Sequence, residues 1–291
     1  MSLLSPSVIA AIDDLELAAR VVVEGLQVGG NRSPFHGYGA EFQQYRSYRP
    51  GDDLKYLDWK MYARSDRLFT RQFRETTNLS MMLVVDTSAS MGYPLESQGK
   101  LRYAVLLAAS LAYLVVEQGN AVGLLARQQG EMVYLPAKSG RTHLRTLLAR
   151  LDSLRAAGDW NGPVTIRRAA ELLRRRGLMM VISDFYDDEA AVQAELRQVV
   201  QRGHDVTMLQ VLSPAEREWQ RDGQLDLEDL ETGDKRVVNA GAIRATYNAA
   251  VREFLDRSRS TAASSGIDYA YMQTDTPPER ALREYLIART R

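Results

Sequence analysis

Two continuous apolar runs that each end in an aspartate place the strongest constraint on the fold of this chain. The run "SMMLVVD" ends at Asp86, and "LMMVISD" ends at Asp184. Each has the length of one strand and lacks the alternation of apolar and polar residues that marks a half-exposed strand. Continuous apolar strands are typical of parallel sheets that are covered on both faces. The chain is therefore expected to bury a sheet between two layers of helices.

The segments around these two strands alternate between helix and strand patterns. Helices are predicted near residues 100–119, 142–154, 163–177, 189–203 and 242–265, and a last one begins at Pro277. Short strands are predicted at 121–127 and 131–137, around a turn at Gly130, and at 204–212 and 267–273. This order predicts an α/β fold of the Rossmann-like kind, with a mostly parallel sheet and helices on both faces.

The chain is expected to divide into two domains. Residues 1–79 are predicted to form an N-terminal helix, from about Ser7 to about Gly25, and then two or three short strands between Glu41 and Thr77. Residues 80–291 are predicted to form the α/β domain, with a β-hairpin inserted near 224–238 that turns at Thr232–Asp234.

Composition excludes several classes of site. Lys plus Arg and Asp plus Glu both number 37, so no excess charge demands a polyanionic partner, and the absence of cysteine removes thiolate metal sites and cysteine nucleophiles. Acidic residues at 13, 14 and 16 interrupt the apolar stretch that a signal peptide needs, and the apolar segment 104–116 is shorter than the ~20 residues of a membrane span. We therefore expect a cytoplasmic protein without membrane insertion.

Residues 45–74 combine eight basic residues and seven aromatic residues with four aspartates. Basic residues among aromatic ones are compatible with single-stranded nucleic acid. Strands that pack their rings inward and expose their charges produce the same pattern. We favour a structural subdomain, which also offers a docking surface, and expect no nucleic-acid partner.

Polar oxygen donors follow the two apolar strands. Asp86, Ser88 and Ser90 come directly after the first strand, Asp184 ends the second, and Thr142 lies in a loop that we expect to reach the same edge of the sheet. Ligands of open α/β sheets bind at the carboxyl ends of the strands. A donor set of oxygen alone favours Mg²⁺, or else Mn²⁺ or Ca²⁺, over zinc or copper. Two carboxylates and three hydroxyl groups leave such an ion short of negative charge, so an acidic side chain of another protein is expected to complete its shell.

These motifs resemble those of a known family. "DTSAS", a loop threonine and "ISD" are similar to the metal-ion-dependent adhesion site (MIDAS) of von Willebrand factor A-type (VWA) domains. The stretch "RSYRPGDDLKYLDW" ahead of "LVVDTSASM" resembles a bacterial family catalogued as domain of unknown function 58. That resemblance implies a VWA-like fold and a non-enzymatic interaction module, which recruits or regulates a MoxR-type AAA ATPase in a chaperone-like or regulatory assembly. It also implies that the five oxygen donors ligate the ion, Asp184 directly or through water.

Three further residues are expected to contact the partner at the rim of this site: Met91, Gly92 and Phe185. Phe185 stands where many A-type domains have glycine, which is expected to change the shape of the rim.

Two other interpretations remain open. In the first, Asp86, Ser88 and Ser90 belong to a strand-to-helix turn and their side chains only cap backbone groups, while Thr142 is an ordinary N-cap. Alternatively, the chain is a magnesium-dependent phosphatase or phosphotransferase of the haloacid dehalogenase type, with Asp86 as the nucleophile and "SDFYDD" as the acidic cluster. That chemistry needs a second aspartate two positions after the nucleophile as its general acid, where Ser88 stands. We therefore predict that the chain is not an enzyme.

Overall fold

A computed structural model of the chain describes residues 14–27, 40–49, 52, 57–75, 79–95, 99–174, 176–230 and 233–289. The chain divides into two compact units, of which unit 1 comprises residues 1–34 and 80–291 and unit 2 comprises residues 35–79. The predicted helix start at Ser7 and the predicted hairpin-turn residue Thr232 lie outside the described residues.

Unit 1 is built on a six-stranded sheet with the strand order β10-β7-β6-β3-β4-β5. All neighbouring strands are parallel except β5, which runs antiparallel to β4 at one edge. The strands are β3 (Ser80–Val85), β4 (Ala121–Gln128), β5 (Glu131–Lys138), β6 (Leu178–Ser183), β7 (Asp205–Leu212) and β10 (Asp268–Gln273). The predicted α/β fold with a mostly parallel sheet is confirmed.

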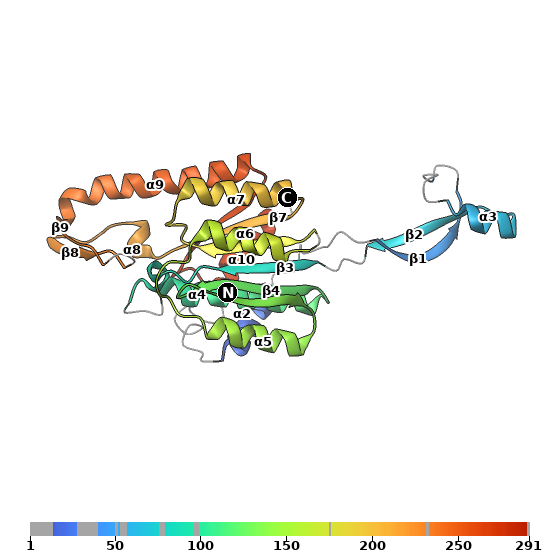
Figure 1. Cartoon of the computed structure of the whole chain (residues 1–291), viewed down its shortest axis with the longest axis horizontal. Helices are drawn as coiled ribbons and strands as arrows, with labels where there is room; N and C mark the ends of the chain where they lie inside the picture. Colours follow the sequence, from blue (N-terminus) through green and yellow to red (C-terminus); the bar gives the residue numbers. More distant parts are fainter. Residues whose placement is uncertain are drawn as a thin grey trace. The chain divides into compact units, whose positions relative to one another are not determined.

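Helices cover both faces of this sheet (Figure 1). One layer contains α6 (Gly162–Leu172), α7 (Glu189–Gln201) and α9 (Ala240–Ser264), which close a core over β3, β6 and β7. The other contains α2 (Leu15–Gln27), α4 (Gly99–Glu117) and α10 (Pro278–Arg289), which contact one another, and α5 (Arg141–Asp152), which packs on α4 and β4. Apart from one terminal serine each, strands β3 and β6 are apolar, as expected for strands covered on both faces.

Helix α4 is long and apolar enough to cross a membrane by length and composition, and 83% of its apolar window is buried inside the protein. Its side chains pack on both sides, against the sheet and against α2, α5 and α10. A helix that is apolar all round and enclosed in this way has the character of a core helix.

Helix α2 groups with unit 1, whereas the sequence placed it in an N-terminal subdomain with the strands that follow it. Its contacts with α4 and α10 explain the difference. An amphipathic helix must bury its apolar face, and here Ala18, Ala19 and Val22 are fully buried.

Unit 2 is an antiparallel pair, β1 (Ala40–Ser47) with β2 (Phe69–Glu75), joined by a segment that contains α3 (Trp59–Ser65). Sequence analysis predicted the strands and missed the helix. The signal was Asp58, whose side chain accepts hydrogen bonds from the backbone N–H groups of Lys60 and Met61 as an N-cap.

The predicted hairpin insertion is present in unit 1 as β8 (Gln224–Glu228) and β9 (Lys235–Asn239). It lies between the short helix α8 (Pro214–Arg217) and α9. Asn239 ends β9 and also caps α9, since its side chain accepts from the backbone N–H of Ala242. The hairpin is thereby fixed at its base to the start of the longest helix.

Candidate functional site

The strand order changes direction between β3 and β6, and the two predicted aspartates follow these two strands. From β3 the chain proceeds outward through β4 to β5, and from β6 it proceeds the other way through β7 to β10. Ligand sites of open α/β sheets form at such a switch point, at the carboxyl ends of the strands. Asp86 and Asp184 are therefore neighbours in space, as predicted.

Asp86 is almost completely buried, with 1% of its surface exposed. Its Oδ1 accepts a hydrogen bond from the backbone N–H of Ser88 at 2.7 Å, and its Oδ2 accepts from the hydroxyl of Ser183 at 2.5 Å. Burial, and then the nearby charge of Asp184, raise the pKa of Asp86 to about 8. This carboxyl group therefore binds a proton more readily than an ordinary aspartate.

Ser88 and Ser90 lie together as expected, with their hydroxyl oxygens 2.9 Å apart. Ser88 is buried, whereas Ser90 is half-buried and begins to face outward. The segment between α5 and α6 holds the loop after β3 in place. The N–H of Ala89 donates to the carbonyl of Gly158, and the carbonyl of Thr87 accepts from the N–H of Ala157. The chain between α5 and α6 thus borders the site.

Thr142 does not join the site, which corrects the prediction. The side chain of Thr87, beside Asp86, donates to the carbonyl of Arg127 near the end of β4, whereas the ring of His143 contacts the carbonyl of Val122 near its start. Five residues of extended strand separate these two points, or about 16 Å. Because β5 is antiparallel, it delivers the start of α5 to the amino edge of the sheet. Thr142 is exposed there.

A lysine ammonium group occupies the space beside Asp184. The Nζ of Lys100 lies 2.7 Å from Oδ2 of Asp184 and 2.5 Å from Oε1 of Glu216, and its side chain is fully buried. Burial alone lowers the pKa of Lys100, but the charges of Asp184 and Glu216 outweigh that effect and raise it. Lys100 is therefore charged and held by two carboxylates.

Glu216 is fixed by a capping box at α8. Its Oε2 accepts from the backbone N–H and from the hydroxyl of Ser213, and the N–H of Glu216 donates back to that hydroxyl. Sequence analysis missed both Lys100 and Glu216. The available signals were a lysine in the first turn of a mostly apolar helix and the spacing "SPAE", in which serine precedes glutamate by three positions.

The residues brought together fit the predicted magnesium site in part. Asp86, Ser88, Ser90 and Asp184 supply oxygen atoms of the kind that Mg²⁺ prefers. One oxygen of Asp184 is in contact with an ammonium group, and Thr142 is at the other edge of the sheet. Within the described part of the chain, no group of three or more His, Cys, Asp or Glu side chains is placed to hold a metal ion.

Two of the three residues expected to contact a partner are buried. Met91 is fully buried in the short 3₁₀ turn η2 (Ala89–Gly92), and only 4% of Phe185 is exposed. Phe185 adopts the left-handed conformation that favours glycine, with φ of 60°, and this turns its ring into the core beneath α6 and α7. Gly92 is half-buried. The neighbour Tyr186, 39% exposed, forms the rim in place of Phe185.

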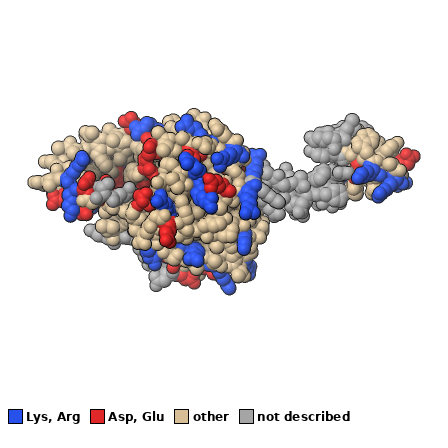
Figure 2. Space-filling view, in the orientation of Figure 1, with Lys and Arg blue, Asp and Glu red and all other residues tan. Residues whose placement is uncertain are grey.

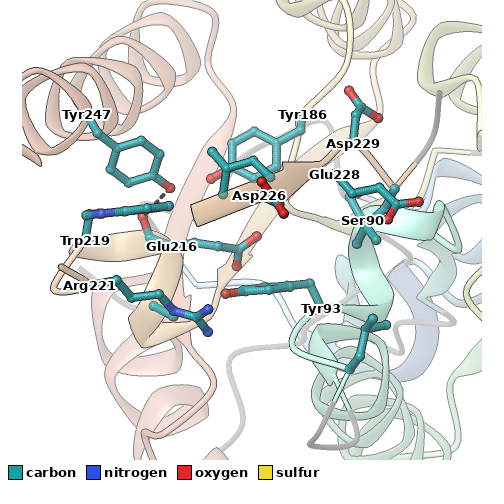
Figure 3. Close-up of a pocket in the computed structure, with 14 residues that line it drawn as sticks. Ser90, Tyr93, Tyr186, Glu216, Trp219, Arg221, Asp226, Glu228, Asp229 and Tyr247 are labelled. Atoms are coloured by element: carbon teal, nitrogen blue, oxygen red, sulfur yellow. Dashed lines mark hydrogen bonds between the residues drawn. The ribbon is translucent and has the colours of Figure 1, made fainter. Parts of the chain in front are cut away.

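A cavity of about 530 Å³ opens directly beside this cluster (Figure 3). It lies between the loop after β3, the residue that follows Phe185, the α8 region, the β8–β9 hairpin and α9. Its lining residues are Ser90, Tyr93, Leu95, Tyr186, Ala215, Glu216, Trp219, Arg221, Asp226, Leu227, Glu228, Asp229, Leu230 and Tyr247. Ser90 and Glu216 belong both to this cavity and to the buried cluster.

The burial of Asp86 argues against the phosphatase interpretation. A nucleophilic carboxylate must reach a phosphorus atom, but both oxygens of Asp86 accept hydrogen bonds inside the protein. The residue two positions later is Ser88, whose hydroxyl contacts Ser90. The side chains around Asp86 thus stabilise a buried turn.

Comparison with known proteins identifies the family. The sequence matches the family described as "Protein of unknown function DUF58" over residues 44–256. The chain belongs to the DUF58 family. An uncharacterized protein of Mycobacterium tuberculosis is 33% identical over 233 residues, which make up 78% of this chain and 72% of that protein.

Among solved structures, the chain is similar to BatB from Bacteroides thetaiotaomicron, with a TM-score of 0.46 and 16% identity over 73% of this chain and 98% of that one. The VWA domain of SpRpn10 is similar with a TM-score of 0.42 and 11% identity, over 71% of this chain and 94% of that domain. The fold of the α/β unit is defined by its own six-stranded, mostly parallel sheet with helices on both faces.

The relatives found in this comparison are bacterial.

Proposed function

We propose that this DUF58 protein is a non-enzymatic module that binds a partner protein at the carboxyl edge of its parallel sheet. The observation that carries the proposal is the open cavity at the topological switch point, with Ser90 and Tyr186 on its wall beside a cluster of buried, internally paired charges. Exposed aromatic groups on a rigid base are typical of protein-binding surfaces.

A MoxR-type AAA ATPase is the proposed partner. The support is the resemblance of "RSYRPGDDLKYLDW" and "LVVDTSASM" to a family whose members are associated with such ATPases. The match to DUF58 extends through both of these stretches. In this proposal the chain recruits or regulates the ATPase in a chaperone-like or regulatory assembly, in the cytoplasm.

The magnesium ion stays a prediction. Asp86, Ser88, Ser90 and Asp184 would hold it, and Lys100 would have to leave Asp184, because an ammonium group in contact with that carboxylate repels a dication. A bound ion would supply an open coordination position for an acidic side chain of the partner. Calorimetric titration of Mg²⁺ into the wild type and Asp86→Ala tests this, since binding must be lost in the variant while the thermal transition stays cooperative. A wild type that takes up no Mg²⁺ contradicts the prediction.

Binding of the partner is tested with two variants at opposite edges of the sheet. Ser90→Arg places a bulky cation at the carboxyl edge, and Thr142→Arg places the same group at the exposed amino edge. Affinity for a purified, nucleotide-free MoxR-type ATPase is measured by calorimetry, with and without chelator. We expect a loss of at least about tenfold for Ser90→Arg and wild-type affinity for Thr142→Arg. Equal losses in both variants, or no binding by the wild type, would refute the proposal.

A further inference from the structure

The cavity beside the buried cluster differs from the cluster in its chemistry, since its walls are aromatic and acidic. Tyr93, Tyr186, Trp219 and Tyr247 line it, together with the carboxylates of Glu216, Asp226, Glu228 and Asp229 and one guanidinium group, that of Arg221. Figure 3 shows Trp219 and Tyr247 side by side on one flank, with Asp226 and Glu216 extending over the same space. Aromatic faces and carboxylates are the two groups that attract organic cations.

The aromatic walls are held in fixed positions. The rings of Trp219 and Tyr247 lie 5.2 Å apart at 54°, and the hydroxyl of Tyr247 donates to the backbone carbonyl of Glu216 at 3.0 Å. The backbone N–H of Trp219 donates to the side chain of Asn248 at 2.8 Å. Tyr186 stacks on Phe254 with ring centroids 5.5 Å apart. The binding surface is therefore formed before a ligand arrives, so ordering it costs little on binding.

The charges of the lining are unequal in a way that favours a cation. Four carboxylates line the cavity against one guanidinium group. Glu216 shares Lys100 with Asp184, Glu228 is paired with Lys235 at 3.2 Å, and the side chain of Asp226 is exposed. Lys100 itself lies 5.1 Å from the centroid of the Tyr186 ring, on the buried side. The same walls thus already stabilise one ammonium group from within.

We propose that this cavity binds an arginine side chain of a basic segment in the partner protein. The apolar stem of arginine fits against Trp219 and Tyr247, and its planar guanidinium group stacks on aromatic rings and pairs with a carboxylate such as that of Asp226. A cavity of about 530 Å³ exceeds the needs of one side chain and also accommodates the flanking backbone. This inference rests on the proposed function and names the chemistry of its partner, which is opposite to the acidic side chain that a bound metal ion would select.

The test is a calorimetric titration of the full chain with a short capped peptide that has one central arginine, against the same peptide with citrulline. Citrulline keeps the shape of arginine and removes its charge. We expect a dissociation constant of about 10⁻⁴ to 10⁻³ M for the arginine peptide and binding at least about fivefold weaker for the citrulline peptide. A rise from about 50 to about 500 mM salt is expected to lower the affinity of the arginine peptide more than that of the citrulline peptide. Equal affinity for the two peptides would overturn the inference.

Protein variants locate the binding within the cavity. Asp226→Asn and Trp219→Leu are each expected to lower the affinity for the arginine peptide by about three- to tenfold. Asp222→Asn is the matched control, because Asp222 is exposed and pairs with Arg244 outside the lining. A loss in the control as large as in Asp226→Asn would also overturn the inference.

The inference and the proposed function fail in different ways. Suppose that Ser90→Arg loses affinity for the ATPase, while Asp226→Asn and Trp219→Leu bind it like the wild type. The carboxyl edge is then the binding surface, and the inference that the cavity binds arginine is wrong. If the wild type binds the arginine peptide and shows the expected variant effects but does not bind the ATPase, the pocket stands and the proposed partner is wrong.

Discussion

The buried cluster around Asp86 and the open cavity beside it share two residues and treat charge in opposite ways. Inside the cluster, Lys100 is surrounded by two carboxylates, and both oxygens of Asp86 accept hydrogen bonds. In the cavity, Asp226 is exposed to solvent. Removal of one partner from a buried charge pair is strongly destabilising, whereas exposed charges beside aromatic rings are available to another molecule. The first region therefore positions the second.

Removal of the Lys100 ammonium group is expected to have the largest effect on the buried cluster. Lys100→Met leaves the buried Asp184 and the half-buried Glu216 without a counter-charge, and we expect a loss of about 3–5 kcal/mol in the free energy of unfolding, measured by urea denaturation. The control is Lys235→Met, whose exposed pair with Glu228 should contribute little.

A double variant separates lost charge pairing from lost packing. Lys100→Met with Asp184→Asn removes charges of both signs, and we expect it to recover part of the stability that Lys100→Met loses. Additive losses in the double variant would show that the pairing of Lys100 with Asp184 does not stabilise the fold.

The titration of Asp86 gives the next largest effect. Its pKa is about 8 in the folded protein, against an ordinary value of 3.8, so between these pH values the folded protein binds a proton that the unfolded chain has released. The free energy of unfolding therefore falls as pH rises from about 4 to about 8. Asp86→Asn does not titrate, and we expect it to be more stable than the wild type by about 1–3 kcal/mol at about pH 8, with a smaller difference at about pH 5.

Urea denaturation at several pH values measures this slope. Asp159→Asn is the control, because the Asp159 side chain is 64% exposed, and it should keep the wild-type slope. A wild-type stability that rises between about pH 5 and 8 while that of Asp86→Asn stays level would show that the Asp86 carboxylate is stabilised in its charged form.

The smallest effect is expected at Tyr247, whose hydroxyl supports the cavity wall while its ring lines the cavity. Tyr247→Phe removes the hydrogen bond to the carbonyl of Glu216 and keeps the ring, so we expect a loss of about 1 kcal/mol in stability and an arginine-peptide affinity within about twofold of wild type. Tyr134→Phe, at an exposed position on β5, is the control and should change neither quantity. A large loss of affinity in Tyr247→Phe would mean that the hydroxyl contacts the ligand.

The architecture and half of the site could be predicted because they depend on local patterns. Two uniformly apolar strands predicted a parallel sheet, and parallel strands bring Asp86 and Asp184 to one edge. The error at Thr142 arose from ignoring the turn at Gly130, which joins β4 to β5 as a hairpin and so sends the chain back to the other edge. That reversal was readable from the sequence.

Other features could not be read from local patterns. Lys100 and Glu216 are 116 positions apart, and only the folded chain shows that a lysine at the start of α4 meets the capping box of α8. The burial of Phe185 follows from a backbone angle of 60°, which no neighbouring residue indicates. The cavity itself depends on where the β8–β9 hairpin lies relative to α9, a matter of tertiary packing.

The capping box at α8 has a mechanical consequence. Glu216 uses one oxygen to hold Ser213 and the other to hold Lys100, so the short helix is tethered to the end of β7 and to the start of α4 at once. Moving α8 outward would break both tethers and expose the Lys100 ammonium group, which is fully buried. A partner that binds as proposed therefore meets a preformed surface at α8, and the conformational adjustment falls on the partner.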